Sequence, residues 1–134
     1  MYRKNQQGFS LMELMVAVGI ILVILTMVMP HVTAARIRTN EVSALRTISA
    51  IHTAQAQYQS QTNKFAVALP ELTTVMSKKL ANGKHSGYTF ILEGTNDGYQ
   101  VTATPEKVGS TGNRTFVSGQ TLSVQDAEGK EVEN

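Results

Sequence analysis

The sequence of 134 residues contains no cysteine. A disulfide framework and thiolate chemistry are therefore both excluded, and any folded domain must be held together by packing. The chain also carries little net charge. The formal net charge of +2 matches the two basic residues Arg3 and Lys4, and from Phe9 onward basic and acidic side chains are equal in number. Direct binding of nucleic acid is not expected, because that function requires a clustered basic face.

Fixed charge is missing altogether from Leu14 to Ala35, and the residues up to Met29 are almost wholly apolar. At about 1.5 Å of rise per residue, roughly 20 helical residues cross the ~30 Å hydrocarbon layer of a membrane. The segment is predicted to be a transmembrane helix, with Arg3 and Lys4 favouring a cytoplasmic N-terminus. A buried core helix is disfavoured, because so short a chain cannot enclose a helix that is apolar on every side.

A secretory signal peptide is another interpretation of a long apolar run near an N-terminus. Its cleavage site would follow the apolar residues, where Thr33-Ala34-Ala35 offers a faint small-residue pattern. The run is longer than a usual signal-peptide core. In addition, the pair Gly8-Phe9 stands before the run and not after it.

Four residues around the apolar run stand in a fixed register. A short basic leader ends in Gly8, Phe9 follows it, Glu13 is the fifth residue counted from Phe9, and Pro30 is the twenty-second. With these spacings, residues 1–30 resemble the N-terminus of a type IV prepilin. The resemblance is specific up to about Pro30, and the sequence beyond it supports the match without adding much specificity.

The resemblance implies that the membrane-bound prepilin peptidase cleaves between Gly8 and Phe9 and methylates the new N-terminus of Phe9. Glycine suits such a position because it leaves the backbone extended and unhindered. Cleavage ahead of the apolar run would keep that run on the mature protein. The subunit is therefore expected in the bacterial inner membrane, as a single-pass protein with its N-terminus in the cytoplasm and its globular part outside.

The resemblance also implies a set of partners. They are identical or related pilin subunits, with a homopolymer expected, the prepilin peptidase, the pilus assembly platform in the inner membrane, and membrane lipid before assembly. After assembly the protein would lie in a cell-surface pilus or in a periplasmic pseudopilus.

A carboxylate beside a membrane span needs an explanation, because a charge at the bilayer centre costs about 2.5 to 3.5 kcal/mol on insertion scales. Glu13 lies about 6 Å along the helix from Phe9, so its carboxylate reaches the interface at lower cost. It could favour the helix N-terminus through the macrodipole, or pair with the amine of its own Phe9. It could also pair with the Phe9 amine of a neighbouring subunit. The resemblance favours this third interpretation, in which Glu13 sets subunit recruitment and register.

Helical patterning continues beyond the membrane span. Pro30 cannot donate an amide hydrogen bond, so it is expected to kink the helix. Past it the pattern becomes amphipathic, and the helix is predicted to run from about Phe9 to Ser60. Apolar residues three or four apart form a predicted docking stripe, which comprises Val42, Leu45, Ile48, Ile51, Ala54 and Tyr58. Much of the remaining surface is polar and includes Arg36, Arg38, Glu41, Arg46 and Gln57.

Farther along the chain the period changes from helical to alternating. A short helix is predicted from Pro70, because proline favours the first helical turn. Two hairpins follow, one joining residues 88–92 to residues 99–103 and the other joining residues 114–118 to residues 121–125. The charged tail after them is expected to be loose.

These patterns predict an α+β fold, with a long N-terminal helix packed against a small antiparallel sheet of three or four strands. The first half of the helix would be transmembrane and the second half amphipathic. The predicted organisation is a leader at residues 1–8, a transmembrane and filament-core helix at 9–30, the amphipathic half of the helix at 31–61, and a globular head at 62–134.

Catalytic and metal-binding patterns are absent from the sequence. The histidines His31, His52 and His85 lie far apart and have no carboxylate grouping that would complete a metal site. The acids Asp97, Asp126 and Glu128 are too few and too scattered to suggest calcium binding. No nucleophile or phosphate-loop motif occurs. We expect no enzyme activity, no catalytic residue, no cofactor and no metal.

The sequence therefore predicts a structural subunit of a type IV pilus or a related filament, processed by prepilin peptidase and polymerised through its N-terminal helix. Two alternatives stay open. One is a pseudopilin of type II secretion or a minor pilin, which the small cysteine-free head also resembles. The other is an unprocessed bitopic membrane protein whose small domain binds a ligand or partner.

Overall fold

The computed structural model describes residues 8–95 and 98–132. The predictions that rest on Arg3, Lys4 and Asp97 concern residues outside this range. Contacts divide the chain into two compact units, residues 1–34 and residues 35–134, which we call the N-terminal unit and the head unit. The three predicted segment boundaries, after residues 8, 30 and 61, remain predictions.

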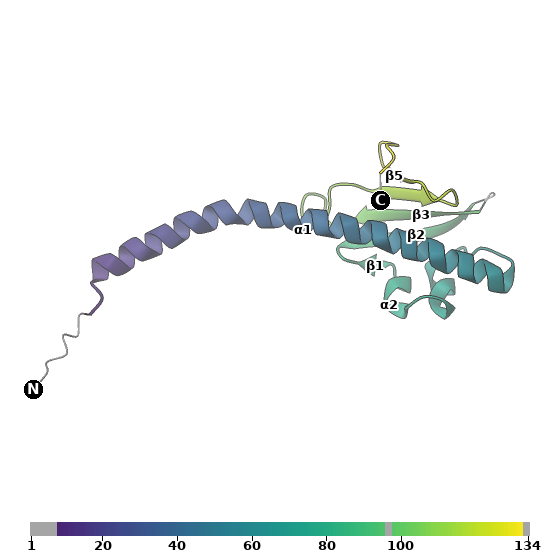
Figure 1. Cartoon of the computed structure of the whole chain (residues 1–134), viewed down its shortest axis with the longest axis horizontal. Helices are drawn as coiled ribbons and strands as arrows, with labels where there is room; N and C mark the ends of the chain where they lie inside the picture. The colour runs from purple at the N-terminus through teal and green to yellow at the C-terminus, as the bar shows by residue number, and fades with distance from the viewer. Residues whose placement is uncertain (1–7, 96–97, 133–134) are drawn as a thin grey trace, which may run out of the picture. The chain divides into compact units, whose positions relative to one another are not determined.

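One long helix, α1, runs from Leu11 to Thr62 (Figure 1). It ends two residues beyond the predicted end at about Ser60, and the next residue, Asn63, adopts a left-handed conformation with a φ of 57°. The amide of Asn63 donates to the carbonyl of Gln59 over 2.7 Å and thereby closes the last turn. Asparagine tolerates this conformation better than most residues, which makes it a common helix terminator.

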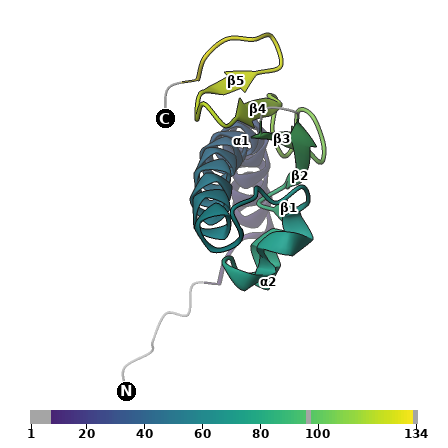
Figure 2. The ribbon, with the colours of Figure 1, turned by 90° about the vertical axis from the view of Figure 1, so that its right-hand side faces the viewer.

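The predicted α+β architecture is confirmed, and the antiparallel sheet has five strands where three or four were expected. The strands are β1 (Lys84–His85), β2 (Tyr88–Thr95), β3 (Gly98–Pro105), β4 (Phe116–Gly119) and β5 (Val124–Asp126). Each strand pairs with the next, in the order β1-β2-β3-β4-β5. Within the head unit, the sheet lies along one side of the second half of α1 (Figures 1 and 2).

The unexpected strand is β1, which pairs with β2 through a two-residue turn. Ser86 and Gly87 both have positive φ angles, of 50° and 75°, which is the conformation of a type I′ hairpin turn. The register places His85 opposite Tyr88. A strand of two residues is too short to show alternation in the sequence, so only its turn residues could be recognised.

Two short helices connect α1 to the sheet. The 3-10 helix η1 spans Leu69–Thr74 and has Pro70 in its first turn, which confirms the predicted helix start. It buries Leu69 and Leu72 against the core. The helix α2 covers Lys78–Ala81 and leads into the turn at Gly83.

Alternating residues of the sheet form the core with one face of α1. From the strands these are Tyr88, Phe90, Leu92, Tyr99, Val101, Ala103 and Phe116, and from α1 they include Ala44, Leu45, Ile48, Ile51 and Ala54. All five stripe residues from Leu45 to Tyr58 are buried or partly buried, as predicted. Val42 is the exception, because its side chain is 48% exposed.

The misplacement of Val42 has a geometric cause. A helix turns by about 100° per residue, so a pattern that advances by three residues rotates by about 60° at each step. The predicted docking stripe, which begins at Val42, therefore winds around the helix and does not stay on one face. Around the helix axis, Val42 lies about 120° from Ile48. Glu41 lies only about 20° from Ile48 and is buried, although it was assigned to the polar surface.

The charged tail is ordered as far as Val132, so the expectation of a loose tail is wrong over the described part. The amide of Val132 donates to the carbonyl of Val124 over 2.8 Å, and Gln125 forms an antiparallel bridge with Glu131. The turn between them closes because the Lys130 amide donates to the carboxylate of Asp126 over 2.9 Å.

Candidate functional site

The predicted cleavage site lies just before α1. Gly8, Phe9 and Ser10 belong to no helix or strand, and the side chain of Phe9 is 78% exposed. Ser10 caps the helix with its backbone, because the Leu14 amide donates to the Ser10 carbonyl over 3.1 Å. A peptidase would therefore meet the Gly8–Phe9 bond on non-helical backbone. Cleavage and methylation at these residues remain predictions.

Glu13 is the third residue of α1 and the acidic residue of its first turn. A negative charge there is favoured by the partial positive charge of the helix N-terminus. The sequence from Ser10 to Glu13 also has the S-x-x-E form of a capping box, a signal that was overlooked in the sequence. Within the described residues, however, the carboxylate accepts no hydrogen bond and forms no ion pair.

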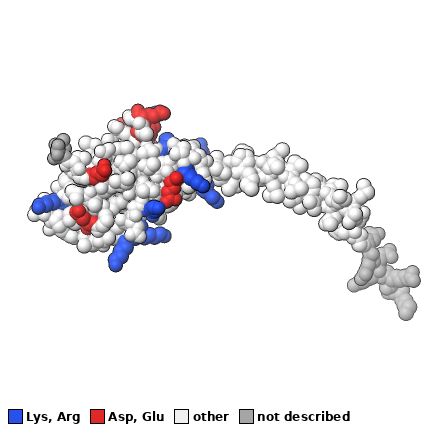
Figure 3. All heavy atoms as spheres, turned by 180° about the vertical axis from the view of Figure 1, so that it is seen from behind, with Lys and Arg blue, Asp and Glu red and all other residues white. Residues whose placement is uncertain are grey.

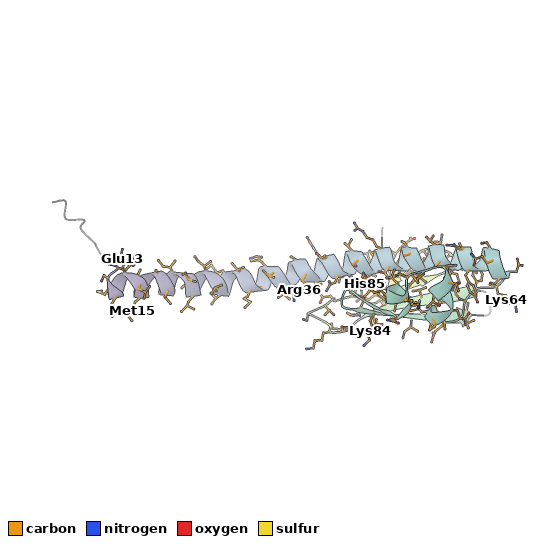
Figure 4. The ribbon with its side chains drawn as sticks, turned by 90° about the horizontal axis from the view of Figure 1, so that it is seen from below. Glu13, Met15, Arg36, Lys64, Lys84 and His85 are labelled. Carbon is orange, nitrogen blue, oxygen red and sulfur yellow. The ribbon has the colours of Figure 1, made fainter. Side chains whose placement is uncertain are left out.

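Pairing between Glu13 and its own Phe9 is not favoured by the local backbone. Residues four apart share a helix face only when both are helical. Because α1 begins at Leu11, Phe9 stands outside the helix in the uncleaved chain. Figure 4 shows the side chain of Glu13 projecting outward from the start of α1.

Side chains of the N-terminal unit are exposed on every side of α1. They include Leu14, Val18, Leu22, Leu25 and Val32, with exposed fractions from 47% to 59%. By length and composition this helix could cross a membrane, and none of its most apolar window is buried. Such a surface is stable only when lipid or protein covers it.

Two threonine hydroxyls within this helix are paired with its own backbone. The hydroxyl of Thr26 donates to the carbonyl of Val23 over 2.7 Å, and that of Thr33 donates to Met29 over 3.3 Å. Such internal hydrogen bonds suit a lipid environment, because the bilayer core contains no water to pair with polar groups. The helix continues through Pro30, which removes one amide donor from the ladder. The predicted kink at Pro30 remains a prediction.

In the head unit, His52 links α1 to two strands. Its Nδ1 lies 2.6 Å from the hydroxyl of Tyr99, and its Nε2 lies 2.8 Å from the hydroxyl of Ser118. Ser118 donates its own proton to the carbonyl of Ser123 over 3.1 Å. The consistent assignment is that Tyr99 donates to His52 and His52 donates to Ser118. Ser118 therefore accepts from the imidazole, which is the opposite of a nucleophile activated by a base.

An open cavity of about 1030 Å³ borders this network. His52, Phe65, Tyr99, Leu122 and Glu131 are among the side chains that line it. The lining mixes apolar and hydrogen-bonding groups and brings together α1, β3 and the C-terminal segment. In the described part of the chain, no three metal-ligating side chains cluster.

Burial lowers the pKa of His52 below its ordinary value of 6.5. The unfolded chain then binds more protons than the folded chain as the pH falls through 6.5, so acid destabilises the head unit. Tyr99 and Glu131 are the other titratable groups at the same cavity. We expect the melting temperature of the head unit, followed by near-ultraviolet circular dichroism in detergent, to be several degrees lower at pH 5.5 than at pH 7.5.

The replacement His52→Gln should remove much of this pH dependence, and His85→Gln should leave it unchanged. His85 is only partly buried and lies in β1, away from the network. Equal pH dependence in the parent protein and the His52→Gln variant would show that His52 does not carry the effect.

A second link between helix and sheet is the ion pair of Glu41 and Arg114. The Arg114 guanidinium donates to one Glu41 oxygen from Nη2 over 2.8 Å and from Nε over 3.2 Å. The other oxygen accepts the Asn113 amide over 3.2 Å. This contact with Glu41 raises the pKa of Arg114, and burial raises the pKa of nearby Tyr88 to about 12. Sequence reasoning missed the pair, since 73 residues separate its members.

Comparison with known proteins gives one match. Residues 3–29 match the family model described as the prokaryotic N-terminal methylation motif. No curated protein and no solved structure matches the chain. The matched family is defined by a structural, pilin-type motif and not by an enzymatic activity.

The match covers Gly8, Phe9 and Glu13 and ends one residue before Pro30. It coincides with the apolar, fully exposed part of α1. The motif indicates a prepilin-type processed protein, either a pilin or a pseudopilin, and the apolar helix is consistent with membrane anchoring. This motif at the start of a long apolar helix makes the chain similar to type IV pilin-like proteins.

Proposed function

We propose that this protein is a structural subunit of a type IV pilus or a related filament. Prepilin peptidase removes residues 1–8 and methylates Phe9, and the mature subunit polymerises with copies of itself on an assembly platform in the inner membrane. The methylation motif supports the processing steps. The exposed apolar face of α1 supports the polymerisation.

The apolar helix carries the proposal. Its side chains are exposed all around, so a single neighbouring surface could cover only part of them. Two environments cover such a helix on every side, namely a lipid bilayer and a bundle of like helices. A filament subunit uses both in succession, first lipid and then the helices of its neighbours.

Localisation follows from the same helix. Before assembly, the subunit would span the inner membrane once, with a cytoplasmic N-terminus favoured by Arg3 and Lys4 and the head unit outside. After assembly, the helix would lie in the filament core, in a cell-surface pilus or a periplasmic pseudopilus.

Glu13 has the properties expected of an intermolecular contact. Its carboxylate has no partner among the described residues of its own chain, and it lies near an apolar surface. Cleavage creates a positive amine on Phe9 at nearly the same depth. In a low-dielectric filament core, the unpaired charges are penalised and the pair between neighbours is favoured. This pairing would set the axial register of each added subunit.

Replacing Gly8 with valine is expected to block removal of the leader. A β-branched side chain crowds the scissile bond and restricts the backbone beside it. The intact mass of the membrane-bound protein should then correspond to residues 1–134, and the parent protein should lack residues 1–8. Gly19→Val is the matched control, because nothing lies within 4 Å of a Cβ at Gly19. Normal processing of Gly8→Val would contradict the proposed cleavage site.

A further inference from the structure

Exposed basic side chains gather at one end of the head unit. Two are on α1, directly after the apolar residues, one is in strand β1, and one is in the loop that follows β3. They are Arg36, Arg38, Lys84 and Lys107, which we call the basic collar. Within the described residues, none of the four forms an ion pair or a side-chain hydrogen bond.

A hydroxyl contact brings Lys84 to this end of the head unit. The Oγ of Ser43 on α1 donates to the Oγ of Ser86 over 2.9 Å. Ser86 belongs to the tight turn that follows β1, and Lys84 is the first residue of β1. Figure 4 shows Lys84 and His85 toward the same end of the head unit as Arg36, with Lys64 at the opposite end.

A second contact positions the loop of Lys107. The side-chain amide of Asn40 on α1 donates from Nδ2 to the backbone carbonyl of Thr111 over 2.8 Å. The hydroxyl of Thr111 in turn accepts the backbone amide of Lys107 over 3.0 Å. The loop is also joined to the turn after β1, since the Glu106 amide donates to the Gly87 carbonyl over 2.9 Å. Lys84 and Lys107 therefore lie near segments that contact the same stretch of α1, at Asn40 and Ser43.

The four collar residues have no ion-pair partner among the described residues. Of the acids nearby, Glu41 is already paired with Arg114, and Glu106 is exposed next to Lys107 in the sequence. Acidic residues of the C-terminal segment, such as Glu128 and Glu131, belong to the other side of the sheet order, beyond β5. Figure 3 shows blue side chains spread over this face of the head unit, with red ones among them. At this end, four basic side chains therefore stand against one exposed acid.

We propose that the basic collar binds the phosphates of anionic phospholipid headgroups while the subunit is anchored in the membrane. Arg36 follows directly after a segment that is long and apolar enough to span the bilayer, so chain continuity places Arg36 and Arg38 at headgroup depth. The contacts with α1 bring the two lysines to the same level. At ordinary ionic strength, an anionic membrane surface attracts basic side chains within about 10 Å, so Lys84 and Lys107 would also be attracted to it.

The proposed role of the basic collar is separate from filament formation, because it concerns the subunit before assembly. It would hold the head unit against the lipid surface, and withdrawal of the subunit would break that contact. A test with unassembled, uncleaved protein therefore succeeds or fails independently of processing and polymerisation.

The test measures how fast a membrane-impermeant, amine-reactive reagent acylates individual lysines of the full chain in vesicles, with mass spectrometry of peptides as readout. Vesicles of phosphatidylcholine alone are compared with vesicles that also contain phosphatidylglycerol. Acylation of Lys84 and Lys107 should slow roughly fivefold in the anionic vesicles and recover in high salt. Lys64 is the internal control and should react equally in both. Equal rates at Lys84 and Lys107 in the two vesicles would overturn the proposal.

Variants separate the collar from general effects of charge. The double replacement Arg36→Gln with Arg38→Gln should restore fast acylation of both lysines in anionic vesicles, and the Arg→Lys pair at the same positions should keep it slow. Arg46→Gln, which removes an exposed arginine farther along α1, should change nothing. Near-ultraviolet circular dichroism checks that each head unit is folded. If the Gln pair is as protected as the parent, Arg36 and Arg38 are not part of the contact.

A last experiment distinguishes binding to lipid headgroups from binding to dissolved anions. Inorganic phosphate is added to the protein in phosphatidylcholine vesicles at the same ionic strength as a chloride control. No slowing at Lys84 and Lys107 is expected, because the collar is spread over three segments and fits a surface of many phosphates. Slowing equal to that in anionic vesicles would assign the collar to free phosphate and overturn the lipid proposal.

Discussion

Replacing Glu13 with alanine is expected to abolish filament assembly while removal of residues 1–8 continues. Without the carboxylate, the Phe9 amine of each incoming subunit is left without a partner in the apolar core. Breaking such a pair costs about 3 kcal/mol or more, which is roughly a hundredfold in the equilibrium constant of each addition. The measurement is the amount of filament sheared from cells, set against the amount of processed subunit in the membrane.

Two further variants show whether charge is the cause. Glu13→Gln keeps the shape of the side chain and should fail like alanine. Met12→Ala lies in the same helical turn, carries no charge and should assemble. A normal yield of filaments from processed Glu13→Ala protein would refute the pairing. Accumulation of unprocessed Glu13→Ala would instead assign Glu13 a role in cleavage.

Replacing Ile51 with alanine is expected to cause a large loss of stability of the head unit. The Ile51 side chain is 0% exposed and packs between the helix and the sheet. Removing a buried isoleucine typically costs about 2 to 5 kcal/mol, through lost burial and the cavity left behind. For a domain of this size, the melting temperature should fall by roughly 10 °C or more.

Val42→Ala is the matched control for Ile51→Ala. Val42 is an aliphatic residue of the same helix with a similar place in the sequence pattern, but its side chain is 48% exposed. Its replacement should change the free energy of unfolding by about 0.5 kcal/mol or less. Thermal unfolding of the full chain in detergent, followed by near-ultraviolet circular dichroism, measures both variants. Similar losses for the two would contradict the observed orientation of α1.

The contrast between these two residues shows where sequence reasoning succeeds. Hydrophobic spacing identified α1, its end near Asn63, and the hairpin of β2 and β3, because each follows from local periodicity or turn chemistry. The spacing of apolar residues alone did not show which side of α1 is buried. Val42 and Glu41 are neighbours in sequence, and the rotation of about 100° per residue places Glu41, not Val42, on the buried side of α1.

Polar contacts between distant segments could not be anticipated from the sequence. Gln55 is 0% exposed, and its amide both donates to and accepts from the backbone of Ala66, over 2.8 and 2.9 Å. Glu41 and Arg114 are a similar case. Such pairs leave no periodic signal, because their partners are chosen by the packing of the whole head unit.

The N-terminal unit gives the opposite lesson. Its side chains have no tertiary partners within the described chain, so the structure adds little to what the sequence implies there. The register of Gly8, Phe9 and Glu13 was recognisable because it is a local pattern along the chain that depends on no tertiary contact. The family match over residues 3–29 rests on the same stretch.

The most direct test of the filament proposal is the intact mass of this protein in filaments sheared from the surface of its native cells. The proposal predicts an abundant subunit whose mass equals residues 9–134 plus one methyl group. The same mass confined to the membrane fraction would indicate a pseudopilin or a minor subunit. A mass that corresponds to residues 1–134 would contradict processing at Gly8–Phe9, and with it the proposed route to assembly.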